Sequence, residues 1–282
     1  MPLEERKIKE IEHSDLRRSI VRAYEYRTDA SPDQSEEKYV EGEREFERHF
    51  SNMKFYSITR SSVAYRDALL FEGIEGAAAL DYCCGNGEVA VDMARRGASR
   101  VVGIDISPVA IENARELARS AGVDAVCEFT VMDAEHTDFT DGTFDLIHEY
   151  GALHHLDLTT AYEELARILK PGGKVVCTEA LRHNPLIHWY RKRTPQLRTQ
   201  WEVEHILGVQ DLNNARKNFG DVSVGFFHLA VLAAVPFRKT PLFKPLCRIL
   251  NRVDSIILKN HGIGKYGWIM VFVMRLPGSM QE

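Results

Sequence analysis

Two short apolar runs, each ending in an acid, constrain the fold of this chain more than any other feature. Residues 80–87 read LDYCCGNG, and residues 101–105 read VVGID. A buried strand followed by glycines and a helix leaves backbone N–H groups open to a nucleotide-like ligand, and an acid about 20 residues further on can accept ribose hydroxyls. The pattern predicts an α/β fold that binds such a ligand at the carboxyl ends of its strands.

The acid at Asp81 indicates which kind of ligand is bound. Residues 85–90 also satisfy the loose Gly-x-Gly-x-x-Ala pattern of dinucleotide-binding turns, but that pattern alone has little specificity. A carboxylate just before the glycines would repel a pyrophosphate, whereas it suits the cationic amino and sulfonium groups of S-adenosylmethionine. The pattern therefore favours the methyl donor over NAD.

Four linked segments, in a fixed order, carry a family resemblance. They are the glycine loop, Asp105, the stretch Met132-Asp133-Ala134, and a run from Phe144 to Ile147 that leads to LKPGG at residues 169–173. Over residues 78–180 the chain resembles class I S-adenosylmethionine-dependent methyltransferases, in particular the small-molecule group that includes the ubiquinone/menaquinone C-methyltransferases. Cys83 stands where the family has its first glycine, and we interpret it as a small residue under the cofactor or as a core thiol that contacts no ligand.

The resemblance implies a Rossmann-like methyltransferase fold, an α/β structure whose doubly wound, mostly parallel seven-stranded sheet carries an N-terminal helical cap and an inserted helical roof. In such a fold Gly85 and Gly87 let the cofactor lie against the backbone, and Asp105 holds the ribose. Asp133 and the amide of Ala134 contact the adenine. The predicted cofactor-binding residues are Asp81, Cys83, Gly85, Gly87, Asp105, Ile106, Asp133, Ala134, Glu149 and Tyr56.

The alternation of strand and helix patterns predicts a parallel sheet with helices on both faces. Strands are expected at residues 77–82, 101–105, 125–131, 143–149 and 174–179, followed by an antiparallel pair at 222–229 and 267–275. Helices are expected at 88–96, 108–121 and 158–169, with further helical structure to about 219. We divide the chain into a cap or lid (1–70) and a methyltransferase domain (71–282) with a cofactor half (78–180), a substrate-side part (181–282) and an insertion at about 231–266.

The segment 148–156 offers several proton acceptors where the fourth strand ends. Its sequence, HEYGALHHL, contains Glu149, His154 and His155, which we predict as catalytic candidates because methyl transfer to an acid needs a general base. The alternative is that one histidine only packs or pairs locally. We predict no bound metal.

A second cluster, after the fifth strand, mixes cations with aromatic rings. The predicted substrate-binding residues are Tyr150, His183, His188, Tyr190, Arg191 and Arg198. Such a set suits an anionic or flat aromatic substrate, and the alternative is an amphipathic helix with a solvated face. Upstream, the segment 54–60 is a candidate lid, in which Phe55 or Tyr56 would close over the cofactor.

Composition indicates a soluble protein of the cytoplasm. The five cysteines form no Cys-x-x-Cys pair, the charged N-terminus lacks a signal-peptide core, and the longest apolar run, 224–237, is too short to span a bilayer. The net charge of -5 hides an asymmetry, because residues 61–180 carry 9 basic and 21 acidic residues and residues 181–282 carry 15 and 6. A basic amphipathic stretch at 245–259 makes contact with a membrane surface possible, although a simple cap over the core is favoured.

Several alternatives to small-molecule methylation stay open. Residues 149–152 read EYGA in place of the Asp/Asn-Pro-Pro-aromatic motif of adenine N-methyltransferases. This disfavours a nucleic-acid substrate, although the basic C-terminal third leaves transfer RNA open. A cyclase or rearrangement catalyst could use the same scaffold, and an oxidoreductase is the weakest alternative. The sequence does not indicate the oligomeric state.

Overall fold

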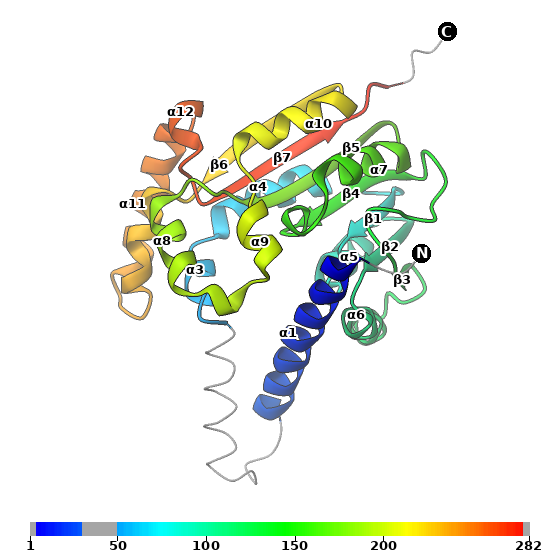
Figure 1. Ribbon diagram of the computed structural model, residues 1–282, viewed down its shortest axis with the longest axis horizontal. Coiled ribbons are helices and arrows are strands. Elements are labelled where there is room, and N and C mark those ends of the chain that lie inside the picture. Colours follow the sequence, from blue (N-terminus) through cyan, green and yellow to red (C-terminus); the bar gives the residue numbers. More distant parts are fainter. Residues whose placement is uncertain (1–3, 30–49, 279–282) are drawn as a thin grey trace.

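The computed structural model describes residues 4–29 and 50–278, which build one seven-stranded sheet covered by helices (Figure 1). The strand order is β3-β2-β1-β4-β5-β7-β6, with β1 to β5 parallel and β7 antiparallel to both neighbours. The strands are β1 (Ala78–Tyr82), β2 (Arg100–Asp105), β3 (Cys127–Val131), β4 (Phe144–Tyr150), β5 (Leu169–Ala180), β6 (Asp221–Phe227) and β7 (Ile269–Arg275). The prediction of a doubly wound, mostly parallel sheet with a late antiparallel pair is confirmed.

The central strands are buried on both faces, which explains their nearly continuous apolar runs. In β1 only Ala78 is partly exposed, and in β7 every residue from Ile269 to Met274 is buried. Two apolar clusters result, one on each face: α4, α5 and α6 contribute Leu70, Met93 and Ile111 to the first, and α7 and α10 contribute Leu165 and Leu212 to the second.

Local signals position the helices as the sequence predicts. In α6 the hydroxyl of Ser107 accepts the Ala110 N–H at 3.0 Å, Pro108 occupies the first turn, and Gly122 ends the helix with a φ of 68°. The longer helices are α1 (Glu5–Asp29), α4 (Arg60–Phe71), α5 (Glu88–Arg95), α6 (Pro108–Ala121), α7 (Leu158–Ile168), α8 (Pro185–Arg193), α10 (Leu212–Asn218) and α11 (Phe243–Ile257). The shorter α-helices are α3 (Met53–Tyr56), α9 (Gln200–His205) and α12 (His261–Gly264), and the 3₁₀ helices are η1 (Leu153–His155), η2 (Pro195–Leu197), η3 (Val209–Asp211) and η4 (Ala230–Phe237).

Several boundaries differ from the prediction by one or two residues, and two differences are larger. Strand β5 begins at Leu169, because that residue already pairs with Phe144 and the chain stays extended through Gly172 and Gly173. The helical stretch expected up to about residue 219 is divided into α8, α9 and α10 with short turns between them, since Pro195 and Gly208 interrupt it. Residues 30–49 of the predicted cap lie outside the described part of the chain.

The architecture brings distant segments to the carboxyl edge of the sheet. Helix α1 contacts α6, and α9 contacts η1, which directly follows β4 (Figure 1). Ligands of open parallel sheets bind at this edge, so α1 and α9 can close a site that the strands begin.

Candidate functional site

A cavity of about 490 Å³ lies at the carboxyl ends of β1, β2, β4 and β5, and helices α1, α3, α8 and α9 close it. Twelve predicted site residues line it, namely Cys83, Asp105, Ile106, Asp133, Ala134, Tyr56, Tyr150, Tyr190, Arg191, Arg198, His154 and His155. Six others do not line it, namely Asp81, Gly85, Gly87, Glu149, His183 and His188.

The glycine loop after β1 has the left-handed backbone that its sequence requires. Cys83, Gly85 and Gly87 have φ values of 59°, 54° and 80°. A Cβ on Gly85 would lie 2.5 Å from the Arg18 guanidinium, and a Cβ on Gly87 would lie 2.8 Å from Ala114. Gly87 therefore allows close packing of the loop on α6, and Cys83 is the loop residue that borders the cavity.

Asp81 has a structural position behind the loop. One carboxylate oxygen accepts the Ala90 N–H at 3.0 Å and the other lies 2.8 Å from His148 Nδ1, with only 2% of the residue exposed. These bonds join β1, the start of α5 and β4. A direct contact of Asp81 with a ligand stays a prediction.

Asp105 ends β2 and borders the cavity with both oxygens held by backbone donors. Gly85 N–H donates to one oxygen at 3.0 Å, and Ser107 N–H donates to the other at 2.9 Å. Burial raises the pKa of Asp105 even though both N–H groups favour the carboxylate. Asp105 lines the cavity at the end of a parallel strand, the position from which an acid can accept ribose hydroxyls.

Helix α1 supplies a wall of the cavity that sequence analysis missed. Arg6, Lys7, Glu10 and Arg17 recur with helical spacing and all line the cavity. Lys7 Nζ lies 2.6 Å from the Asp133 carboxylate, so this predicted adenine contact is already in an ion pair.

The base candidate His154 is oriented by an acid from β5. His154 Nδ1 lies 2.7 Å from Glu179 Oε2, with side chains 12% and 0% exposed. Burial alone would lower the pKa of His154, but the Glu179 carboxylate outweighs it and the pKa is raised. His154 is therefore held in one orientation with Nε2 turned away from Glu179, the arrangement that a general base needs.

Glu149 lies beneath this pair and is not a wall residue. Its Oε1 accepts the N–H groups of Ala152 at 2.6 Å and Leu153 at 3.2 Å, which shapes the turn before His154. Burial and the charge of Glu179 raise the pKa of Glu149 well above its ordinary value. A catalytic or cofactor role for Glu149 stays a prediction.

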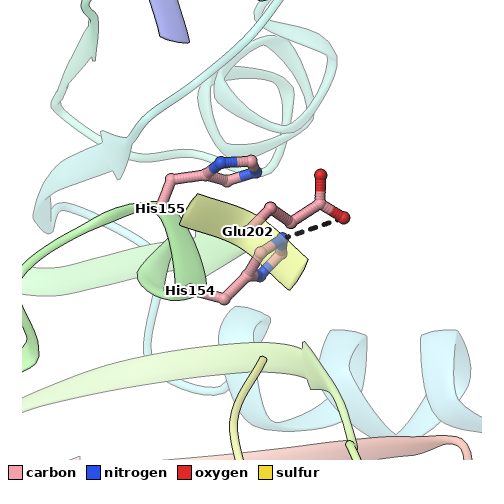
Figure 2. Close-up of side chains that lie close together, drawn as sticks. All are labelled: His154, His155 and Glu202. Carbon is pink, nitrogen blue, oxygen red and sulfur yellow. Dashed lines mark ion pairs between the residues drawn. The ribbon is translucent and has the colours of Figure 1, made fainter. Parts of the chain in front are cut away.

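His155 and Glu202 complete the polar cluster around His154 (Figure 2). Glu10 pairs with His155 Nδ1 at 2.9 Å, and Glu202 Oε1 lies 3.9 Å from His154 Nε2. Ligand atoms of the three residues in Figure 2 lie within 4.8 Å of one another, a donor set that could hold a metal ion. Arg198 Nε lies 3.2 Å from the same Glu202 oxygen, so an arginine already balances that carboxylate.

On the substrate side, helix α8 presents only one of its faces to the cavity. Tyr190 and Arg191 line it, whereas His183 before α8 and His188 on its outer face are exposed. Burial, together with the neighbouring Arg198, lowers the pKa of Arg191 to about 10, and Arg191 Nη1 donates to the Leu181 carbonyl at 2.9 Å. The cluster is thus divided between a buried cationic face and a solvated one.

Aromatic rings form the wall that adjoins α8. Phe55 and Tyr56 of α3 approach the Trp268 ring at centroid distances of 5.9 and 5.4 Å, and Phe55 contacts Tyr190 at 4.9 Å. Tyr190 is fixed by a 2.8 Å hydrogen bond between its hydroxyl and Ser51. The geometry fits the predicted lid, whose closing function stays a prediction.

Comparison with known proteins agrees with this architecture. Residues 79–173 match the family model described as a methyltransferase domain. A 27-O-demethylrifamycin SV methyltransferase of Amycolatopsis mediterranei is 37% identical over 36% of this chain and 38% of its own length. A 2-phytyl-1,4-naphtoquinone methyltransferase of Nostoc punctiforme is 33% identical over 44% of this chain and 51% of its own. This chain thus spans about half or less of the length of these relatives.

A solved structure extends the likeness in fold beyond that segment. The geranyl diphosphate C-methyltransferase of Streptomyces coelicolor superposes with a TM-score of 0.54 over 88% of this chain and 86% of its own, at 18% identity. The strand order and the matches identify residues 79–173 as a class I methyltransferase domain, the class that binds S-adenosylmethionine. The resemblance inferred from the sequence is confirmed for this domain.

Proposed function

We propose that this chain is an S-adenosylmethionine-dependent methyltransferase that acts on a small lipophilic or anionic molecule. Asp105 carries the proposal, because it borders the cavity at the end of β2 with its carboxylate fixed by N–H groups of the glycine loop and of the α6 cap. The methyltransferase domain match over residues 79–173 supports the choice of cofactor. In this proposal Cys83, Asp105, Ile106, Asp133 and Ala134 hold the cofactor.

The transfer step requires alignment more than covalent chemistry. The sulfonium methyl is displaced in line by an acceptor atom held about 3 Å away, and a dry pocket supplies most of the advantage. His154 would accept the proton of the acceptor through Nε2, with Glu179 stabilising the imidazolium that forms. Thr178 lines the cavity, and its buried Oγ1 has no hydrogen-bond partner among the described residues.

The residues that line the cavity support a small lipophilic or anionic substrate. Phe55, Tyr190 and Trp268 give an apolar surface, and Arg191 places a buried guanidinium beside it. A molecule with a flat or lipophilic body and a carboxylate or phosphate would satisfy both. The relatives named for rifamycin and naphtoquinone substrates support the lipophilic part.

The test is transfer from methyl-labelled S-adenosylmethionine to a panel of quinols, phenols and lipophilic acids, read by product mass. Methylation adds the mass of one methylene group, whereas a cyclase or rearrangement catalyst leaves the mass unchanged. His154→Gln should lower turnover about 100-fold or more while the protein still binds the cofactor. Mass-neutral conversion of a panel member would reject methyl transfer, and full activity in the variant would reject His154 as the base.

A further inference from the structure

Helix α11, on the outer side of the molecule beyond β6 (Figure 1), has an apolar face that nothing in the described chain covers. Leu242, Ile249, Val253 and Ile256 are 58%, 58%, 39% and 71% exposed. Their spacings of 7, 4 and 3 residues place all four on one side of the helix. Ordinary surfaces expose single apolar side chains rather than such a stripe.

The adjoining side of the same helix is firmly seated, so the exposure is not a consequence of a loose helix. Leu250 packs on the core, and Asp254 is 5% exposed. The Asp254 carboxylate accepts the N–H groups of Leu229 at 3.2 Å, Ala230 at 2.7 Å and Val231 at 3.2 Å, which joins α11 to η4. The outward orientation of the stripe is therefore built into the fold.

The charges around the stripe have one sign. Residues 237–266 contain seven basic side chains and one acid, and that acid is the buried Asp254. All seven are exposed, and among the described residues no carboxylate forms an ion pair with any of them. They are Arg238, Lys239, Lys244, Arg248, Arg252, Lys259 and Lys265. Phe237, Ile263 and Tyr266, which are 40%, 40% and 42% exposed, extend the apolar area at both ends of the helix.

We propose that this face, called the α11 face below and consisting of residues 237–266, docks on an anionic lipid surface. An apolar stripe with basic flanks is the pattern of helices that lie in a membrane interface, where the apolar side chains enter the acyl boundary and the cations meet lipid phosphates. A second copy of the chain is a poor occupant, because a two-fold contact would bring seven cations against seven.

Docking requires no membrane-spanning segment, and within the described residues no helix is long and apolar enough to be one. The lipid surface would also lie close to the cavity. Helix α11 packs on η4, and η4 contacts α3, which carries the wall residues Phe55 and Tyr56. The docking itself does not depend on methyl transfer.

The experiment is sedimentation of the full chain with vesicles of phosphatidylglycerol and phosphatidylcholine, compared with vesicles of phosphatidylcholine alone. We expect binding to the anionic vesicles at low salt and its loss at about 0.5 M salt. At that salt concentration the attraction between charges extends only a few ångströms before it is screened. Each cation at an anionic surface strengthens binding about fivefold, so Arg248→Glu with Arg252→Glu should weaken it at least about 25-fold.

Two matched variants separate docking from general charge and stability effects. Arg115→Glu with Arg119→Glu makes the same charge change on α6, where both side chains are at least 50% exposed, and should leave nearly all of the binding. Ile256→Glu, at an exposed position, should weaken binding without lowering the melting temperature. Equal loss in the α6 variant, equal binding to neutral vesicles, or no binding at low salt would overturn the proposal, as would a concentration-dependent dimer that Ile256→Glu dissolves.

Discussion

Replacing Glu179 by glutamine tests the arrangement around His154 in detail. The substitution keeps the shape of the side chain and removes its charge. In the wild-type chain His154 Nδ1 and Glu179 Oε2 are 2.7 Å apart in a nearly water-free position. Charges about 4 Å apart at an effective dielectric constant of about 20 interact by roughly 4 kcal/mol, which is enough to outweigh the burial that opposes a charged imidazole.

The pKa of His154 should therefore fall in Glu179→Gln. It is raised above 6.5 in the wild type by the carboxylate, and burial lowers it once that carboxylate is neutral. NMR titration of the His154 ring measures this directly, with His154→Gln to assign the resonance. Glu10→Gln is the matched control, because Glu10 pairs with His155, and it should leave the His154 titration in place.

Stability should change in a defined pH window. The interaction that raises the His154 pKa stabilises the fold below pH 6.5, and this contribution is lost as the pH rises through the His154 pKa of the folded state. The interaction that lowers the Glu179 pKa stabilises the fold above pH 4.5, and this contribution is lost as the pH falls through the Glu179 pKa of the folded state. The unfolding free energy of Glu179→Gln should therefore be about 2 kcal/mol lower than that of the wild type at any pH between 4.5 and 6.5, and the difference should be smaller at pH 9. A His154 resonance that titrates identically in wild type and variant would refute the assignment of Glu179 as its partner.

Three further predictions address the lid, the cation and the glycine loop. Tyr56→Ala should raise the dissociation constant of S-adenosylmethionine several-fold by calorimetry if its ring, which lines the cavity beside Trp268, acts as a lid; unchanged affinity would argue against a lid. Arg191→Met should raise KM for an anionic acceptor about tenfold and leave cofactor affinity intact, whereas an equal effect on a neutral acceptor would count against anion binding. Gly87→Ala should lower the stability measured by urea unfolding by about 3 kcal/mol, and Gly122→Ala by only about 1 kcal/mol. Both glycines have a positive φ, but only at Gly87 would the added Cβ meet a neighbour, at 2.8 Å. Equal costs would contradict the packing role of Gly87.

The sequence was most informative where local rules decide the structure. The strands around Asp81 and Asp105 and the caps of α6 follow from apolar runs, glycines and a serine within a few residues of one another. The strand order followed from the resemblance rather than from periodicity. The start of β5 was misjudged because the pairing of Leu169 with Phe144 joins residues 25 apart.

The site was only partly predictable for a related reason. Asp105 at the end of β2 and His154 just after β4 lie where the fold dictates, and Glu179 could have been found by the same rule because it lies one residue before the end of β5. Lys7 and the rest of the α1 wall come from a helix that ends 49 residues before β1 begins, and no local signal indicates such a contact. His188 pointed outward because packing, not composition, sets which face of α8 is buried.

The central claim is that the cavity bordered by Asp105 binds S-adenosylmethionine. Calorimetric titration of the purified chain with S-adenosylmethionine, S-adenosylhomocysteine and NAD, repeated with Asp105→Ala, tests it most directly. The account predicts micromolar binding of both sulfur ligands, loss of that binding in the variant, and none for NAD. Absence of binding by either sulfur ligand to a folded wild-type chain, or equal binding in the variant, would contradict it.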